Sequence, residues 1–286
     1  MSLTLPDCIR HTLNPAGKAF IDIKHPAVTA SIALEGAHLL QCTPVGKAPL
    51  LWVSPDDPQL PGKSLRGGIP LCWPWFGGDR PPMAHGVARR APWTLTAASQ
   101  DAQGVYLRFD LSADEIARLL PNEAWQVHVE YRLGTVLDVQ LTTRNAGQQA
   151  MKLTQALHTY LPVSDIHQAR ISGLDDAAYI DAMDDWTHKT QQGDIHFAAE
   201  LDRIYYGHSS ALQLYDAVNP VKVERSGSES VVVWNPWQAK SLRLSEFPAD
   251  GYLGMLCIEA ANAGPDARWL EPGQSHTLGT RISHSN

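Results

Sequence analysis

The alternation of apolar and polar residues along much of the chain is the feature that most restricts its fold. Residues 105–111, 125–133 and 137–144 alternate with a period of two and without a break. Successive side chains of a strand point to opposite faces, so this pattern is typical of sheets with one buried and one hydrated face. Residues 230–234 and 254–258 are more continuously apolar, which indicates strands covered on both faces. The pattern predicts an all-β chain, arranged as an antiparallel sandwich or barrel.

Helix signals are few. Ser112 and Glu115 form a capping box, in which each side chain can satisfy a free backbone donor of the other residue. Apolar residues follow at helical spacing until Pro121, so we expect one short helix between two strands. Residues 164–208 are rich in Asp, His and Gln, and their pattern assigns no element.

Composition indicates a globular chain. Hydrophobic residues make up 44% and charged residues 19% of the 286 positions, enough to bury a sizeable core. The 20 prolines and 21 glycines are spread along the chain and form no linker, so we treat residues 1–286 as a single domain. The net charge of −7, without a run of Lys or Arg, argues against nucleic-acid and membrane partners. We expect a monomer that binds a small molecule.

The four cysteines are Cys8, Cys42, Cys72 and Cys257, and none forms a Cys-x-x-Cys pair. We expect reduced thiols, mostly buried as small apolar residues. The first residues lack a basic segment followed by an apolar one, and no apolar stretch approaches the roughly 20 residues of a spanning helix. These features predict a cytoplasmic protein.

Residues 64–78 are too rich in Gly, Pro and Trp for a regular element. Gly67 and Gly68 allow a positive φ or a close approach of another backbone segment. Trp73 and Trp75 point in alternate directions, so one of them, taken here as Trp75, is a candidate to stack on the apolar face of a sugar. The alternative is a buried loop in which both indoles only pack.

Basic residues gather close to this segment. In an acidic chain, Arg66 with Arg89 or Arg90 is a candidate phosphate clamp, because guanidinium groups bind phosphate oxygens bidentately. His85 lies beside them in sequence. The alternative is that each arginine pairs with a surface carboxylate.

Three further residues are candidates for chemistry. His158 lies in an apolar, strand-like segment, where a histidine is either catalytic or a satisfied core residue. Glu259 shares a strand face with Met255 and Cys257, and desolvation there would raise its pKa toward a value useful for a base. Glu259 could instead point into water at the strand end. Asp202 could bind a sugar hydroxyl, or pair with Arg203 or another cation.

Several familiar motifs are missing. The chain has no Gly-x-x-x-x-Gly-Lys-Ser/Thr phosphate loop, no Gly-x-Gly-x-x-Gly dinucleotide turn and no Gly-x-Ser-x-Gly elbow. Its histidines do not follow His-x-His or His-Glu-x-x-His metal spacing. We therefore expect neither a cofactor nor a metal.

Several short segments, taken in the order in which they occur, are similar to those of a known family: 66–70 with 74–77, 85–89 with Trp93, 157–160, 202–205, 234–237 and 257–259. Together they resemble the hexose-6-phosphate mutarotases, or glucose-6-phosphate 1-epimerases, of the aldose-epimerase superfamily. The resemblance runs from about residue 30 to about residue 280 and is anchored by Arg-Gly-Gly-Ile-Pro at 66–70 and Asn-Pro-Trp at 235–237.

The resemblance implies a large β-sandwich, called a supersandwich, that interconverts the anomers of a phosphorylated hexose without a cofactor. The family's catalytic base and acid fall on Glu259 and His158. Its phosphate-binding arginines fall on Arg66 and Arg89, with Arg90 as a rival for the second. Its sugar-contacting positions fall on His85 and Asp202.

Two departures bear on the substrate. Ala260-Ala261-Asn262 follows Glu259 where relatives often have Pro or Gly, and Glu246 stands where Asp is expected. Three other functions stay open at this point: an aldose 1-epimerase of unphosphorylated sugars, a non-catalytic carbohydrate-binding module, and a hydrolase that pairs Glu259 with Asp202.

Overall fold

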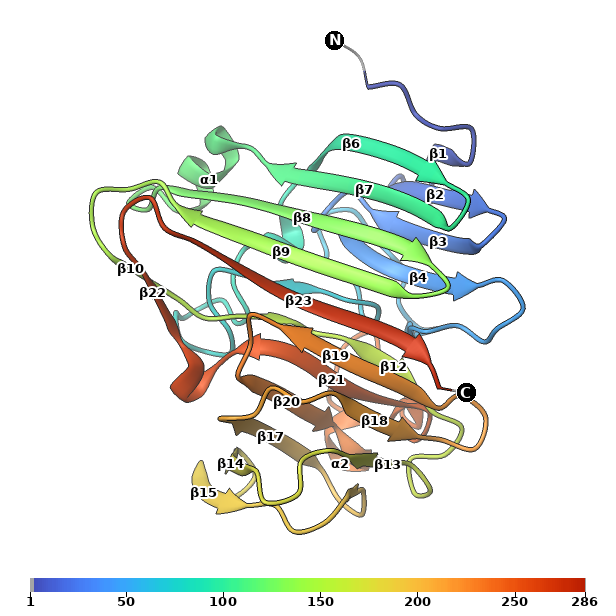
Figure 1. The fold of residues 1–286 in the computed structure, drawn as a ribbon, viewed down its shortest axis with the longest axis vertical. Helices are drawn as coiled ribbons and strands as arrows, with labels where there is room; N and C mark the ends of the chain where they lie inside the picture. The colour runs from blue at the N-terminus through green and yellow to red at the C-terminus, as the bar shows by residue number, and fades with distance from the viewer. Residues whose placement is uncertain (1–2, 286) are drawn as a thin grey trace.

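The computed structural model describes residues 3–285 and consists mainly of antiparallel sheets (Figure 1). The largest sheet has nine strands, in the order β16 (Ile195–His196), β13 (Arg170–Ser172), β18 (Leu212–Tyr215), β19 (Val221–Ser226), β23 (Ser275–His284), β9 (Leu137–Asn145), β8 (Trp125–Gly134), β7 (Gly104–Leu111) and β6 (Thr94–Asp101). Strands β7, β8 and β9 are the three predicted from strict alternation, and their buried residues alternate with more exposed ones as expected.

A second sheet has eight strands. Seven follow the order β15 (Thr187–Thr190), β14 (Ala178–Asp181), β17 (Leu201–Tyr206), β20 (Ser230–Asn235), β21 (Met255–Asn262), β11 (Gln155–Leu157) and β5 (Leu71–Cys72), and β12 (Tyr160–Pro162) also pairs with β21. Every residue of β20 and β21 is buried, which confirms the prediction of strands covered on both faces.

Two smaller sheets complete the strands. One contains β1 (Ile9–Leu13), β2 (Ala19–His25), β3 (Val28–Ala33) and β4 (His38–Pro44), and the other pairs β10 (Met151–Leu153) with β22 (Arg268–Leu270). The predicted antiparallel sandwich is thus confirmed.

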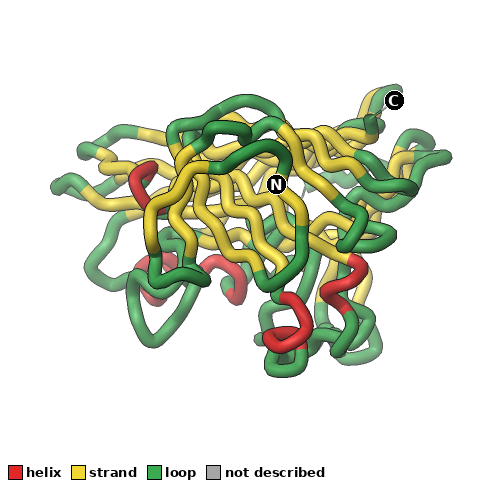
Figure 2. Tube along the Cα trace, turned by 90° about the horizontal axis from the view of Figure 1, so that it is seen from below, coloured by secondary structure: helices red, strands yellow, loops and turns green. Residues whose placement is uncertain are grey.

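The two faces of the eight-stranded sheet have different partners. On one face, residues such as Leu157, Val231 and Ile258 join the main core, where β11 and β21 pack against β23 of the nine-stranded sheet. On the other face, Trp234 and Cys257 belong to a separate apolar cluster. Long loops and most of the short helices gather on one side of the strands (Figure 2). The two faces of the eight-stranded sheet are therefore covered by different groups of apolar side chains.

The predicted helix is α1 (Ala113–Leu119). Ser112 caps it by accepting a hydrogen bond from the Glu115 backbone N–H at 3.2 Å. The Glu115 carboxylate pairs with Arg118 rather than returning to the backbone of Ser112, so only half of the predicted capping box is confirmed. The other helical segments are α2 (Trp237–Ser241) and three 3-10 turns, η1 (Ala88–Arg90), η2 (Gly251–Gly254) and η3 (Gly264–Asp266).

The segment around Arg66 is fixed by a close approach of backbones. Gly67 and Gly68 have φ values of 113° and 63°, which L side chains rarely adopt. A Cβ on Gly68 would lie 2.2 Å from the Leu39 carbonyl oxygen, and one on Gly67 would lie 2.5 Å from that of Trp52. Both glycines thus have the role that the sequence indicated.

The cysteines are free thiols, three of them buried and Cys8 half-buried, as predicted. Residues 164–208, which the sequence left unassigned, form the short strands β13 to β17. Among residues 3–285, no helix is long and apolar enough to cross a membrane.

Candidate active site

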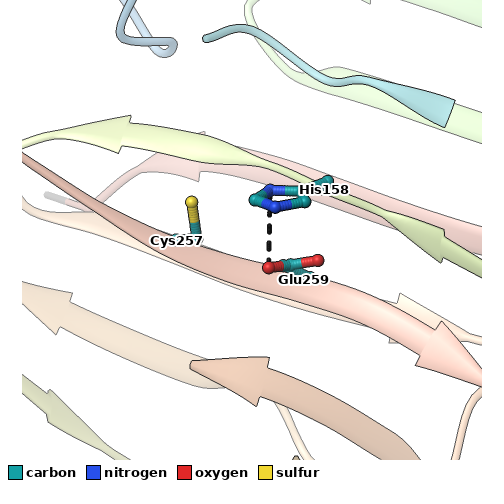
Figure 3. A group of neighbouring side chains, drawn as sticks. All are labelled: His158, Cys257 and Glu259. Atoms are coloured by element: carbon teal, nitrogen blue, oxygen red, sulfur yellow. Dashed lines mark ion pairs between the residues drawn. The ribbon is translucent and has the colours of Figure 1, made fainter. Parts of the chain in front are cut away.

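The register of β21 with the chain segment that forms β11 and β12 brings the two candidate catalytic residues together. Leu157 pairs with Ala260 and Tyr160 pairs with Cys257, so His158 lies opposite Glu259. Their side chains point toward each other, with Nδ1 of His158 3.4 Å from Oε1 of Glu259 (Figure 3). Neither His158 Nδ1 nor Glu259 Oε2 has a hydrogen-bond partner among residues 3–285. Two titratable side chains therefore lie side by side with unused hydrogen-bonding capacity.

The two members of the pair differ in exposure. The His158 side chain is 12% exposed, whereas that of Glu259 is 1% exposed. The imidazole is therefore the more accessible member of the pair, and the carboxyl group is almost fully withdrawn from solvent.

A row of side chains crosses the same sheet face beside the pair. Asp202 pairs in register with Trp234, Trp234 with Cys257, and Cys257 with Tyr160. Because neighbours in register share a face, these four side chains form one row across β17, β20, β21 and β12. Asp202, from a different part of the chain, is thereby brought toward the pair.

Aromatic rings hold the imidazole of His158 in place. The Tyr160 ring stacks on it, with ring centroids 4.9 Å apart and an interplanar angle of 9°. The rings of Trp234 and His85 meet it edge-on at 5.9 and 5.7 Å. These contacts restrict the orientation of the imidazole, which a group that transfers a proton along a fixed direction requires.

The surroundings favour the uncharged forms of both groups. Burial raises the pKa of Glu259 well above its usual value, with the Asp202 charge adding to the rise and Arg89 opposing it. Burial lowers the pKa of His158 well below its usual value, and His85, Arg89 and Arg66 lower it further. An ionised Glu259 is thus a stronger base, and a protonated His158 a stronger acid, than either group in water.

The arginines differ in position. Arg66 is half-buried and its Nη2 donates to the Ser245 carbonyl at 3.3 Å, while its buried Nε has no hydrogen-bond partner in the part of the chain that the structure describes. Arg89 is half-buried and its Nη2 donates to the Ala84 carbonyl at 2.9 Å. Arg90 is exposed and its Nε donates to the Ser64 hydroxyl at 3.2 Å. Arg66 and Arg89, but not Arg90, influence the pKa values of His85 and His158.

His85 and Asp202 flank the pair. His85 packs against Phe76, and burial lowers its pKa to about 4, with Arg89 and Arg66 contributing, so it is neutral near pH 7. The Asp202 side chain is 32% exposed, and Oδ2 lies 3.9 Å from Nζ of Lys240. Partial burial raises the pKa of Asp202, which Lys240 opposes. The cation beside Asp202 is therefore Lys240, since the guanidinium of Arg203 approaches Asp181.

Trp75 lies in the main core. It is 6% exposed, and its indole N–H donates to the Met83 carbonyl at 2.8 Å. Stacking on a sugar, the role considered for this residue from the sequence, would require its packing partners to move. Trp73 is fully buried and donates to Thr143, which matches the packing alternative.

The sequence did not assign roles to Tyr160, Trp234 and Cys257, although all three lie next to the pair. Alternation was the available signal for two of them, because Tyr160 and Cys257 lie two residues from His158 and Glu259. Trp234 is brought in only by the pairing of β20 with β21.

The structure is thus an antiparallel β-sandwich with a histidine and a glutamate side by side on one sheet face. The sequence model of the family described as aldose 1-epimerase matches residues 20–283, and the chain belongs to that family.

Similar proteins carry a more specific description. A protein of Escherichia coli K12, provisionally named glucose-6-phosphate 1-epimerase, is 35% identical over 90% of this chain and 87% of its own. One of Salmonella typhimurium with the same provisional name is 36% identical over 85% of this chain and 83% of its own. A crystal structure from Salmonella typhimurium, provisionally titled a mutarotase, superposes with a TM-score of 0.90 at 30% identity, covering 100% of this chain and 96% of that one.

Proposed function

We propose that this protein interconverts the α and β anomers of a hexose 6-phosphate, with His158 and Glu259 as the proton-transfer pair. The observation that carries the proposal is the 3.4 Å approach of the two groups on a sheet face that is also within the electrostatic reach of two half-buried arginines. The provisional names of the similar proteins support the same reaction.

The proposed reaction opens and recloses the sugar ring. Glu259, as carboxylate, takes the proton of the anomeric hydroxyl, and His158, as imidazolium, gives a proton to the ring oxygen. The bond between C1 and the ring oxygen breaks as the C1 carbonyl forms. Rotation about C1–C2 exposes the other carbonyl face, and ring closure returns both protons. General acid and base groups each contribute roughly 10²–10⁴-fold to such a reaction.

Desolvation of the pair assists ring opening. Opening leaves a neutral carboxylic acid and a neutral imidazole, the two forms that burial favours through the raised pKa of Glu259 and the lowered pKa of His158. Both proton transfers therefore gain driving force from the same low-polarity surroundings.

Arg66 and Arg89 are the proposed phosphate ligands. The unpartnered Nε of Arg66 supports its role, and the electrostatic effect of Arg89 on the pair supports Arg89 over the exposed Arg90. Holding the phosphate fixes the far end of the sugar while C1 rotates. His85 and Asp202 are proposed to bind sugar hydroxyls, and Trp75 is left out of the proposed site.

The arginines also distinguish the proposal from an aldose 1-epimerase of free sugars, because a neutral sugar does not need two guanidinium groups. The test compares anomerisation of α-glucose 6-phosphate and α-glucose by wild type, Arg66→Gln and Arg89→Gln, with Arg90→Gln as the matched control. Loss of one charge-assisted contact of about 1.5–3 kcal/mol lowers kcat/KM by roughly 10- to 100-fold. We expect this loss in Arg66→Gln and Arg89→Gln with α-glucose 6-phosphate as substrate. Neither variant should lose activity on α-glucose, and Arg90→Gln should lose it on neither substrate. Equal losses on both sugars would remove the phosphate clamp.

Compartment and assembly are part of the same proposal. Free thiols fit the reducing cytoplasm, which we propose as the site of action. We also propose that the enzyme acts as a monomer on a small sugar phosphate.

A further inference from the structure

Three metal-ligating side chains meet at the centre of the proposed site. His158, Cys257 and Glu259 each offer a ligand atom, and these atoms all lie within 4.8 Å of one another (Figure 3). The cluster is not visible as a sequence motif, because His158 lies about a hundred residues before the other two and reaches them only through strand pairing.

The spacing of the donors suits a tetrahedral zinc ion. Zinc bonds of about 2.0–2.2 Å to nitrogen and oxygen place two such ligands about 3.4 Å apart in a tetrahedron. Nδ1 of His158 and Oε1 of Glu259 are 3.4 Å apart. The Cys257 sulfur lies within 4.8 Å of the other two ligand atoms and needs to lie about 3.5 Å from them, so it must move by at most about 1.3 Å.

Two of these side chains also have unpartnered polar atoms. Nδ1 of His158 and Oε2 of Glu259 are buried and lack a hydrogen-bond partner within residues 3–285, and the Glu259 side chain is 1% exposed. Buried polar atoms are nearly always partnered, so two unpartnered atoms on side chains that approach to 3.4 Å mark a place for a ligand. Sugar hydroxyls would satisfy them during turnover, and a cation would satisfy them between turnovers.

We propose that His158, Cys257 and Glu259 bind Zn²⁺, and that zinc inhibits the enzyme by occupying its acid–base pair. The inhibition, though not the binding, rests on the proposed function. The Cys257 thiol loses its proton to the solvent as the zinc–sulfur bond forms, and the fourth position stays open to water.

The donor set determines which metals compete with the sugar. Thiolate and imidazole ligands prefer Zn²⁺ and Co²⁺, whereas Mg²⁺ and Ca²⁺ prefer oxygen ligands. The positive charges of Arg66 and Arg89 disfavour any cation at His158, so electrostatic attraction alone does not hold a metal ion there. Zn²⁺ and Co²⁺ therefore inhibit, and Mg²⁺ and Ca²⁺ do not.

Cobalt gives a readout that does not depend on activity. We expect one Co²⁺ per chain, with the near-ultraviolet charge-transfer absorption of a cobalt–thiolate bond, which Zn²⁺ abolishes by displacement. Cys257→Ala and Cys257→Ser should lose this absorption, and Cys42→Ala, which removes a buried thiol elsewhere, should keep it. Cys8→Ala should also keep it and so exclude binding at the half-buried thiol.

Inhibition is the second readout. Zn²⁺ should inhibit anomerisation in competition with the sugar phosphate, and at least tenfold more Zn²⁺ should be needed in a folded Cys257 variant. Absence of the cobalt–thiolate absorption in wild type, or its persistence without Cys257, would overturn the zinc site. If wild type shows the absorption but has no epimerase activity, the metal site stands and the epimerase proposal is refuted. If wild type has epimerase activity but shows no absorption, the epimerase proposal stands and the metal site is refuted.

Discussion

Protonation of His38 should destabilise the folded protein in mildly acidic solution. His38 begins β4, is 1% exposed, and its Nε2 lies 2.7 Å from the carbonyl oxygen of Gly67, next to Arg66. A carbonyl oxygen only accepts, so Nε2 carries the proton in this contact. Burial lowers the pKa of His38 from 6.5 to about 4, opposed by the Gly67 hydrogen bond and reinforced by Arg89 and Lys18.

The direction and size of the effect follow from this pKa shift. Between pH 6.5 and pH 4 the unfolded chain binds a proton at His38 that the folded chain does not, so stability decreases as pH falls through that range. One pKa unit corresponds to about 1.4 kcal/mol, so the full effect below pH 4 is about 3 kcal/mol, of which about 2 kcal/mol is lost by pH 5.

The assay is urea unfolding at pH 8 and pH 5 of wild type and His38→Gln. Glutamine keeps a side-chain N–H for the Gly67 carbonyl and does not titrate. The loss of stability between the two pH values should be about 2 kcal/mol smaller in His38→Gln than in wild type. His11→Gln, at an exposed position, should behave as wild type. Equal pH dependence in His38→Gln and wild type would refute the reasoning.

Two further predictions concern the backbone that carries Arg66. Gly68→Ala should lower stability by at least about 2 kcal/mol in denaturant unfolding, because it adds a 2.2 Å contact with the Leu39 carbonyl oxygen to a strained φ. Gly17→Ala is the control, since Gly17 also has a positive φ but open space around it, and it should cost less. Equal losses of stability in the two variants would contradict the contact argument. Lys18, 1% exposed, donates to Glu35 and to the carbonyls of Leu60 and Lys63. Lys18→Met should therefore lower stability by about 3 kcal/mol and loosen the loop at residues 60–63, which limited proteolysis would detect. Wild-type stability together with an unchanged cleavage pattern would contradict this prediction.

The long strands were predictable because their signal is local. In β7, β8 and β9, one face packs on the core and the other is hydrated. Buried, mostly apolar residues therefore alternate with more exposed ones, and this alternation can be read from the sequence. Strand β15 has no buried residue, and β13 and β16 have three and two residues, so residues 164–208 lack a pattern long enough to detect.

The site was predictable only in part. Alternation places Cys257 on the face of Glu259, but no local rule states that His158 lies opposite Glu259, since that depends on pairing between strands distant in sequence. The resemblance to the epimerases supplied the pairing that periodicity could not. The proposed choice of Arg89 over Arg90 rests on the three-dimensional arrangement, because adjacent residues in a 3-10 turn differ in exposure for reasons of packing.

The most direct test of the central claim is the anomerisation of freshly dissolved α-glucose 6-phosphate by wild type and Glu259→Gln, followed through a dehydrogenase specific for the β anomer. Glu271→Gln, at an exposed position, is the matched control. Wild type and the control should accelerate the reaction equally, and folded Glu259→Gln should lose roughly 10²–10⁴-fold of that rate. Full activity in a folded Glu259→Gln protein, or no acceleration by wild type, would contradict the account.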